Sequence, residues 1–124
     1  MRTPVELAHG WREALVGRDP DAFAALFTAD AEFIDVEHRT ADGTAPRTIR
    51  GRPAIREVCV AWLAAVPAFE YDVLDAVGDD RRAAKRWRYV VGAAHVEGVT
   101  WLDCADGEIE RALVLFDIAG LALG

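Results

Sequence analysis

From residue 69 onward the chain contains strand patterns and turns but no helical pattern, and this limits the folds open to it. Apolar residues recur at every second position, as in half-buried strands. Asp106-Gly107 is a strong signal for a tight hairpin turn, and Gly78-Asp79-Asp80 marks another turn. Because short turns join antiparallel neighbours, we predict a long antiparallel meander. Its strands are expected at 69–77, 83–91, 96–105 and 108–119.

The first half of the chain supplies three helix patterns, each with a proline in its first turn. Thr3 and Glu6 form a capping box at the first of them. The helices are expected from Pro4 to Gly17, from Pro20 through Phe27, and from 51–53 to Pro67. A strand at 31–38, a polar loop at 38–46 and a short returning strand at 47–50 lie between the second and third helices.

Early helices followed by a late meander predict an α+β fold, formed as a single domain over residues 1–124. A strongly twisted antiparallel sheet curls, and its concave side needs a cover. We expect the three helices to wrap around the curved sheet and enclose a cone-shaped, mostly apolar pocket. The large apolar side chains of those helices would form the lid: Trp11, Phe23, Phe27 and Trp62.

Composition and motifs exclude several classes of function. A formal net charge of −7 argues against nucleic-acid binding, which needs a basic surface. The longest apolar runs fall short of about 18 residues, so no membrane span is predicted. The N-terminus lacks a signal pattern, and Cys59 and Cys104 fit no disulfide or zinc motif, which predicts a cytoplasmic protein with reduced, core-filling thiols.

Other absences narrow the chemistry further. The chain contains no serine, no phosphate-binding glycine loop and no histidine pair at metal-ligand spacing. We therefore predict no metal and no cofactor, and acid–base chemistry without a covalent intermediate.

The segment 31–36 places a carboxylate, Asp35, among apolar neighbours just after the first two helices. A carboxylate held in an apolar site gains basicity, and removal of a proton next to a carbonyl needs such a base. The alternative is a solvated strand-edge aspartate, or one paired with a nearby arginine. Trp87 and Tyr89 share one strand face, which suits a pocket wall or a core equally, and Tyr89 would offer a hydroxyl to a developing oxyanion.

Four stretches occur in the order and spacing of a known family: Trp11-Arg12-Glu13-Ala14-Leu15 with Gly17-Arg18-Asp19, 26–33, Ile49-Arg50-Gly51-Arg52-Pro53-Ala54-Ile55, and Asp106-Gly107-Glu108-Ile109. In this respect the chain resembles the nuclear-transport-factor-two-like cone fold. The branch it resembles contains the SnoaL-like polyketide cyclases and the ketosteroid isomerases. Because one fold hosts many chemistries, the resemblance implies the architecture more strongly than the activity.

The resemblance also suggests roles for individual residues. In the isomerase branch an aspartate base works with an oxyanion hole formed by a tyrosine and a protonated aspartate. Asp35 falls at the position of the base, Trp11 at that of the tyrosine, and Thr100 or Val99 at that of the acid. A last-strand carboxylate of the hydrolase and cyclase branches is replaced by Val114. Asp117, three residues on, would reach the pocket only through a bulge.

Taken together, the expected catalytic residues are Asp35, Trp11, Tyr89 and Thr100. The expected substrate-binding residues are Leu15, Phe23, Phe27, Phe33, His38, Trp62, Trp87, Val114 and Phe116. His38 is expected at the pocket mouth or, alternatively, in solvent.

Two functions fit these residues. The first is a cofactor-independent isomerase or cyclase that acts next to a carbonyl on a hydrophobic cyclic or polyketide-derived small molecule. The second is a non-catalytic binding or dimerisation module that uses the same cone. In the family resembled, the convex sheet face often forms a homodimer, and Trp101 suits that face. Arg86 and Arg88 fit a solvated face or an interface.

Overall fold

A computed structural model of the chain describes residues 1–37 and 47–116, and it confirms the predicted α+β class. The elements in chain order are α1 (Pro4–Val16), α2 (Pro20–Ala24), β1 (Phe27–Glu37), β2 (Arg47–Arg50), α3 (Arg52–Ala65), β3 (Glu70–Gly78), β4 (Arg82–Val91), β5 (Ala94–Ala105) and β6 (Glu108–Phe116). The strands form one curved sheet in the order β2-β1-β6-β5-β4-β3. Only β1 and β6 pair in parallel within it, as far as the described residues show.

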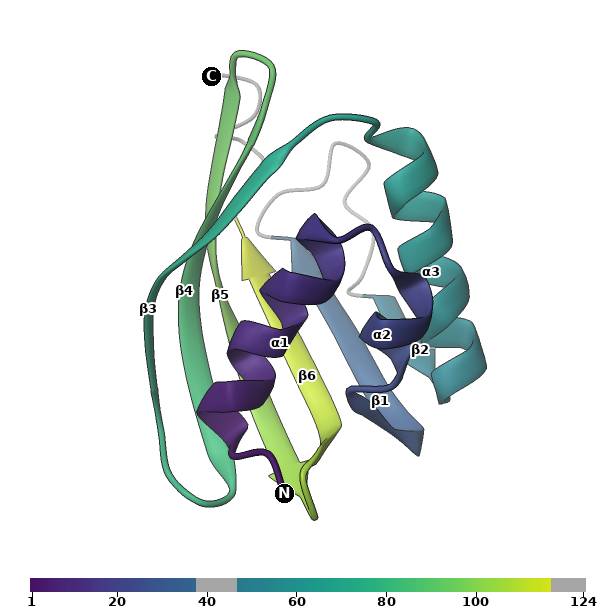
Figure 1. Cartoon of the computed structure of the whole chain (residues 1–124), viewed down its shortest axis with the longest axis vertical. Helices are drawn as coiled ribbons and strands as arrows, with labels where there is room; N and C mark the ends of the chain where they lie inside the picture. The colour runs from purple at the N-terminus through teal and green to yellow at the C-terminus, as the bar shows by residue number, and fades with distance from the viewer. Residues whose placement is uncertain (38–46, 117–124) are drawn as a thin grey trace.

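The helices lie on one side of the sheet (Figure 1). α1 packs over β3 and β4, while α2 and α3 pack on each other near β1 and β2. The predicted capping box is present, since the Glu6 amide donates to Thr3 Oγ1 at 3.1 Å and the Thr3 amide donates to Glu6 Oε1 at 2.9 Å. No helix in the two described ranges is long and apolar enough to cross a membrane.

The second helix is shorter than predicted. It ends at Ala24, and Phe27 already belongs to β1, where it pairs with Ile109 of β6. The Ile109 amide donates to the Leu26 carbonyl at 2.7 Å. Pairing with a distant strand therefore ends the helix, although the local apolar spacing favoured its continuation. β5 also begins two residues earlier than predicted, at Ala94.

Arg18, in the turn after α1, connects that turn to the C-terminal end of α3. Its backbone has a positive φ of 52°, and its guanidinium donates to the Leu63 carbonyl at 2.6 Å and to the Val66 carbonyl at 3.2 Å. These are carbonyls at the C-terminal end of α3, which have no partner within the helix. The positive charge also interacts favourably with the negative end of the helix dipole.

The strand register places five side chains in one row across the concave face. Cross-strand pairing runs from Lys85 to Thr100, then to Val114, Asp35 and Arg47. Directly paired residues point to the same side of a sheet. The row therefore joins the end of the sheet under α1 to the end at β2.

A neighbouring row depends on a glycine. Trp87, Gly98 and Phe116 are paired across β4, β5 and β6. A Cβ at residue 98 would overlap the Trp87 indole and the Leu115 carbonyl. Glycine at this position lets the large ring lie flat on β5, where it faces the interior.

Candidate functional site

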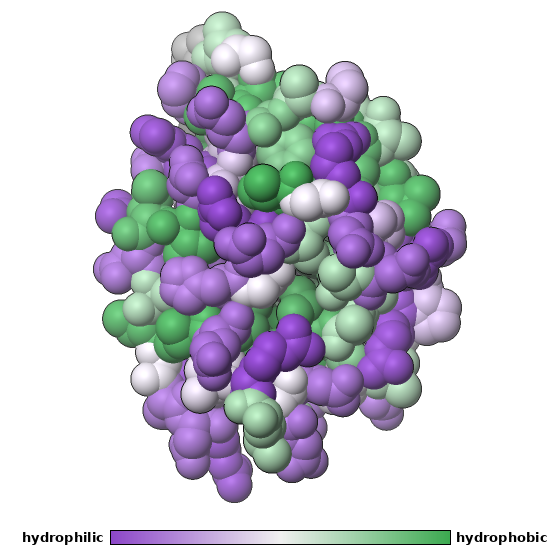
Figure 2. Space-filling view, in the orientation of Figure 1, coloured by the Kyte–Doolittle hydropathy of each residue, from purple (hydrophilic) through white to green (hydrophobic). Residues whose placement is uncertain are grey.

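The curved sheet and the helices enclose a cavity of about 350 Å³. On the face seen in Figure 2, apolar residues gather in the upper part, between the long strands and α3. Eleven of the thirteen predicted site residues line the cavity: Trp11, Leu15, Phe23, Phe33, Asp35, Trp62, Trp87, Tyr89, Thr100, Val114 and Phe116. Among the described residues the lining is mostly aromatic and aliphatic, and it includes one carboxylate, Asp35, with the guanidinium of Arg47 and the hydroxyl of Thr100.

Two predicted residues do not line the described cavity. Phe27 is fully buried and packs against Trp11, Phe23 and Phe33, with ring centres 5.7, 5.3 and 6.4 Å away. It belongs to the core beneath the wall because its strand begins earlier than predicted. His38 lies outside the described residues, and so does Asp117.

Asp35 is the most unusual polar group in the cavity. Its Oδ2 lies 3.4 Å from Arg47 Nη2, while its Oδ1 is buried with no hydrogen-bond partner among residues 1–37 and 47–116. Burial raises the pKa of the Asp35 carboxyl above its ordinary value, and the charge and hydrogen bond of Arg47 oppose that rise. The result is a partly desolvated carboxyl group with one oxygen beside Arg47 and the other without a hydrogen bond from the described residues.

Thr100 lies in the same row, between Lys85 and Val114, and it is oriented by Trp87. The Trp87 Nε1–H donates to Thr100 Oγ1 at 2.8 Å, in a buried setting. Because the hydroxyl accepts that bond, its own proton is available for donation to a second group. Thr100 lines the cavity, whereas Val99 lies on the other face and is exposed. Of the two positions left open by the sequence, Thr100 is therefore the one at the site.

Aromatic rings hold one another at angles around the cavity. Trp11 meets Phe23 edge to face with ring centres 4.9 Å apart and stacks on Phe33 at 5.6 Å. Trp62 meets Tyr89 edge to face at 5.8 Å. Such pairs stabilise each other by about 0.5–1.5 kcal/mol beyond their buried area, so the walls are well ordered. Burial raises the pKa of the Tyr89 phenol, which keeps it a neutral hydrogen-bond donor.

Comparison with known proteins agrees with this architecture. The model of the SnoaL-like domain family matches residues 8–112. The chain belongs to the SnoaL-like family. No curated protein matches it.

Solved structures similar to this SnoaL-like chain share its fold. A protein of ketosteroid isomerase-like fold from Catenulispora acidiphila, in complex with trimethylamine, gives a TM-score of 0.77 at 23% identity, over 96% of this chain and 90% of that one. A proposed ketosteroid isomerase from Kribbella flavida gives 0.71 at 22%, over 91% and 76%. A nuclear-transport-factor-two-like protein of unknown function from Cytophaga hutchinsonii gives 0.73 at 15%, over 98% and 96%. The family match and these shared folds together confirm the predicted nuclear-transport-factor-two-like superfamily.

Sequence reasoning missed four lining residues of the SnoaL-like chain: Arg47, Val58, Cys59 and Tyr71. Val58 stands one helical turn before Trp62, and that spacing could have revealed it. Arg47 faces Asp35 only because of the β1–β2 register, which the sequence does not specify across the intervening loop. Burial raises the pKa of the Cys59 thiol to about 11, so it is a poor nucleophile.

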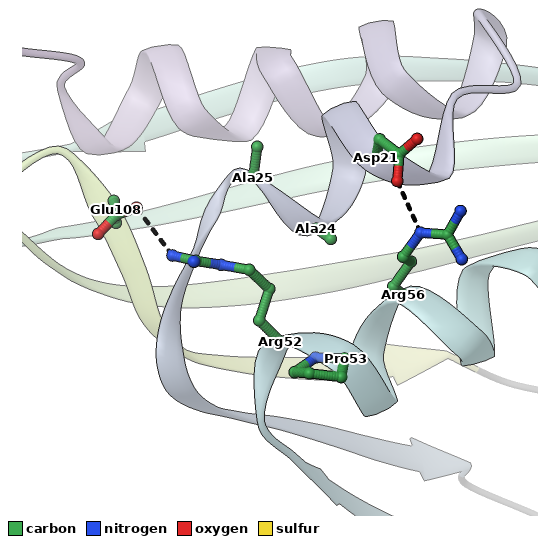
Figure 3. A pocket seen from close by; sticks show the side chains of 7 residues that line it. All are labelled: Asp21, Ala24, Ala25, Arg52, Pro53, Arg56 and Glu108. Carbon is green, nitrogen blue, oxygen red and sulfur yellow. Dashed lines mark hydrogen bonds and ion pairs between the residues drawn. The ribbon is translucent and has the colours of Figure 1, made fainter.

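A second hollow of the SnoaL-like chain, about 430 Å³, lies between α2, α3 and the start of β6 (Figure 3). Arg56 Nε pairs with Asp21 Oδ1 at 2.6 Å, and Arg52 Nη2 pairs with Glu108 Oε2 at 3.2 Å. Arg52 Nη2 also donates to the Phe27 carbonyl at 2.6 Å. Both arginines are thus engaged in joining secondary-structure elements, and we assign this hollow a structural role despite its larger volume.

Proposed function

We propose that this SnoaL-like protein is a cofactor-independent acid–base enzyme, an isomerase or cyclase. Asp35 removes a proton from the carbon next to a carbonyl of a hydrophobic cyclic or polyketide-derived molecule bound in the cavity. The observation that carries the proposal is the buried Oδ1 of Asp35, which lies at an aromatic cavity and has no hydrogen-bond partner among the residues that the structure describes. A desolvated carboxylate is a stronger base than a solvated one, and general-base catalysis contributes about 10²–10⁴-fold.

Hydrogen-bond donors for the developing enolate come from the same cavity. The Thr100 hydroxyl is held by Trp87 with its proton free to donate, and Tyr89 offers a neutral phenol. Trp11 supplies an indole N–H at the position that the family's tyrosine occupies. A donor aimed at developing charge is worth about 2.7–4 kcal/mol. These groups replace the phenol and protonated acid of the isomerase branch.

Arg47 has a complementary role in the proposal. Its guanidinium lines the cavity, and its charge and hydrogen bond oppose the rise in the pKa of Asp35 that burial causes, which favours the ionised carboxylate. A general base must be ionised to accept a proton, and a desolvated carboxylate is more basic than a solvated one. The single Arg47–Asp35 contact at 3.4 Å favours the ionised form and leaves the carboxylate partly desolvated.

Deuterium exchange tests the proposal without knowledge of the product. The protein is incubated in heavy water with cyclic enones, β-keto esters and aromatic polyketide precursors, and uptake at the carbon next to the carbonyl is read by mass spectrometry. Uptake that disappears in Asp35→Asn is the expected result. Uptake that is unchanged in this variant would refute the role of Asp35. No uptake by folded protein would refute the catalytic reading.

A second candidate is a non-catalytic module that binds a tertiary or quaternary amine. Aromatic faces attract cationic ammonium groups, and a carboxylate in the same cavity adds charge complementarity. The Catenulispora acidiphila protein of similar fold was crystallised with trimethylamine. The two functions are separated by calorimetric titration with tetramethylammonium and with neopentyl alcohol, a neutral compound of similar branched shape. Selective binding of the cation that Asp35→Asn abolishes would favour this candidate.

We also propose a homodimer formed through the convex sheet face and a cytoplasmic location. Trp101 is 41% exposed on that face and Val99 is 39% exposed, so both offer apolar surface to a second copy. Cys59 and Cys104 are unpaired and buried, as reduced thiols would be. Sedimentation of the wild type and of Trp101→Glu tests the dimer, and a monomeric wild type would refute it.

A further inference from the structure

The chain contains a single lysine, and that lysine is fully buried. Lys85 lies on β4, and its side chain has 0% exposure, although lysine is among the residues least often buried. It occupies the end of the concave row opposite to Asp35, three strands away, roughly 14 Å along the sheet at about 4.8 Å per strand. The acid–base function described above does not use it.

The surroundings of the Lys85 amine are aromatic. Nζ lies 4.2 Å from the centre of the Trp11 ring and 5.2 Å from that of Tyr71, and it is 3.5 Å from the Ala8 carbonyl oxygen of α1. No carboxylate of the two described ranges forms an ion pair with it. Burial lowers the pKa of Lys85 well below its ordinary value. The faces of the Trp11 and Tyr71 rings attract an ammonium group and act against that shift, but no carboxylate of the described residues adds to them. The phenol of Tyr71 is itself kept neutral by burial, which raises its pKa.

The same groups connect the amine to the cavity. Trp11 and Tyr71, which contact Nζ, also line the cavity, and Thr100, the cross-strand partner of Lys85, lines it as well. One layer of aromatic rings therefore separates the amine from any bound molecule. Contact between a bound carbonyl group and Nζ therefore requires a displacement of Trp11 or Tyr71.

We propose that Lys85 is a nucleophilic amine that forms an imine with an aldehyde or ketone entering from the cavity. The Nζ lone pair attacks the carbonyl carbon and the carbonyl oxygen takes up a proton, which gives a carbinolamine. The carbinolamine hydroxyl then takes up a proton from solvent and leaves as water, which yields the protonated imine. One proton is taken up and one water leaves for each carbon–nitrogen double bond formed. A desolvated lysine in an apolar compartment is the usual form of such a nucleophile. This reactivity is additional to the chemistry of Asp35 and does not depend on it.

The single lysine makes the test unambiguous. Full-length protein at pH 7 is treated with 3-phenylpropanal and sodium cyanoborohydride, which reduces any imine to a stable secondary amine. Intact mass and peptide mapping then locate the adduct on Lys85 or on the N-terminal amine, the only two primary amines of the chain. An ordinary lysine with a pKa of about 10.4 is roughly 0.04% unprotonated at pH 7, so it reacts far more slowly than an α-amine.

The expected result is labelling of Lys85 at a rate comparable to that of the N-terminal amine, and its loss in Lys85→Arg. A cavity ligand such as anilinonaphthalene sulfonate should slow the labelling of Lys85 by tenfold or more and leave the N-terminus unaffected. Labelling of the N-terminus alone until the protein is unfolded in guanidinium would overturn the proposal. Persistence of Lys85 labelling in Asp35→Asn would separate this reactivity from the proposed isomerase or cyclase activity.

Discussion

The two ends of the concave row hold ionisable groups in opposite situations. Near one end Asp35 is partly exposed, lies beside the terminal Arg47 and lines the cavity. At the other end Lys85 is sealed between Trp11 and Tyr71 without a counter-charge in the described ranges. Burial shifts both pKa values so that the neutral form is favoured, upward for Asp35 and downward for Lys85. Asp35 has a charged neighbour, Arg47, that opposes the shift. The comparison teaches that a charged neighbour, and not burial alone, determines how far the pKa of a buried group moves.

The largest expected effect is on the rate of deuterium exchange, and it distinguishes the role of Asp35 from that of Lys85. Asp35→Asn should lower the rate of substrate deuterium exchange by about 10²–10⁴-fold, because a general base is lost. Lys85→Met, which keeps the volume of the side chain, should change the Asp35-dependent exchange by only a few fold. Exchange rates of both variants, measured by mass spectrometry on one substrate, check the comparison. A loss of equal size in both variants would contradict the assignment of Asp35 as the base.

Thr100 lies between the two ends, and its replacement tests the oxyanion donor. Thr100→Val should reduce exchange by about 10²–10³-fold if its hydroxyl stabilises the enolate. It should also lower the free energy of unfolding by about 1–3 kcal/mol, because the buried Trp87 N–H loses its acceptor. Steady-state kinetics and urea unfolding measure the two effects. A loss of stability with full activity would leave Thr100 a structural residue only.

The Lys85 end should make stability depend on pH. The folded pKa of Lys85 is lowered, so between that value and the unfolded pKa of about 10.4 the unfolded chain binds one proton more than the folded chain. The free energy of unfolding therefore rises with pH in that window, by at most about 1.4 kcal/mol per pH unit from this group. Urea unfolding from pH 7 to pH 9 should show this rise in the wild type relative to Lys85→Met. Parallel curves for the two proteins would mean that Lys85 is protonated in the fold.

A smaller effect is expected at Gly98, beneath the ring that orients Thr100. Gly98→Ala would push the Trp87 indole off β5, and overpacking of this kind costs about 1–3 kcal/mol of unfolding free energy. Gly92→Ala is the control, since apart from its chain neighbours no atom of the described residues lies within 4 Å of a Cβ there, although its φ of 60° adds strain of its own. Thermal unfolding of the two variants checks the difference. An equal decrease in melting temperature in both variants would mean that the loss of stability comes from the backbone and not from the overlap with Trp87.

Much of this fold could be predicted because its signals are local. The capping box at Thr3 and the hairpin at Asp106-Gly107 are where the sequence placed them, since each depends on neighbouring residues. The end of α2 could not be predicted, because the pairing of Phe27 with Ile109 across the sheet decides it.

The candidate site divides in the same way. Side chains alternate between the two faces of a strand. This alternation predicted that Phe33 and Asp35 share a face, as do Trp87 and Tyr89, and all four line the cavity. The same alternation extends back to Lys85, so the signal for its inward position was present, but its charge argued for solvent. Nothing local indicates that Arg47 lies beside Asp35, because strand register and loop geometry set that contact.

The pH dependence of deuterium exchange tests the account of Asp35 most directly. Exchange requires the ionised carboxylate, so the rate should rise with pH, with a midpoint above the ordinary value for aspartate. In Arg47→Met the restraining charge is removed, and the midpoint should move to still higher pH. A midpoint that is ordinary in the wild type, or that stays in place when Arg47 is replaced, would contradict the claim that a buried Asp35, restrained by its arginine, is the base.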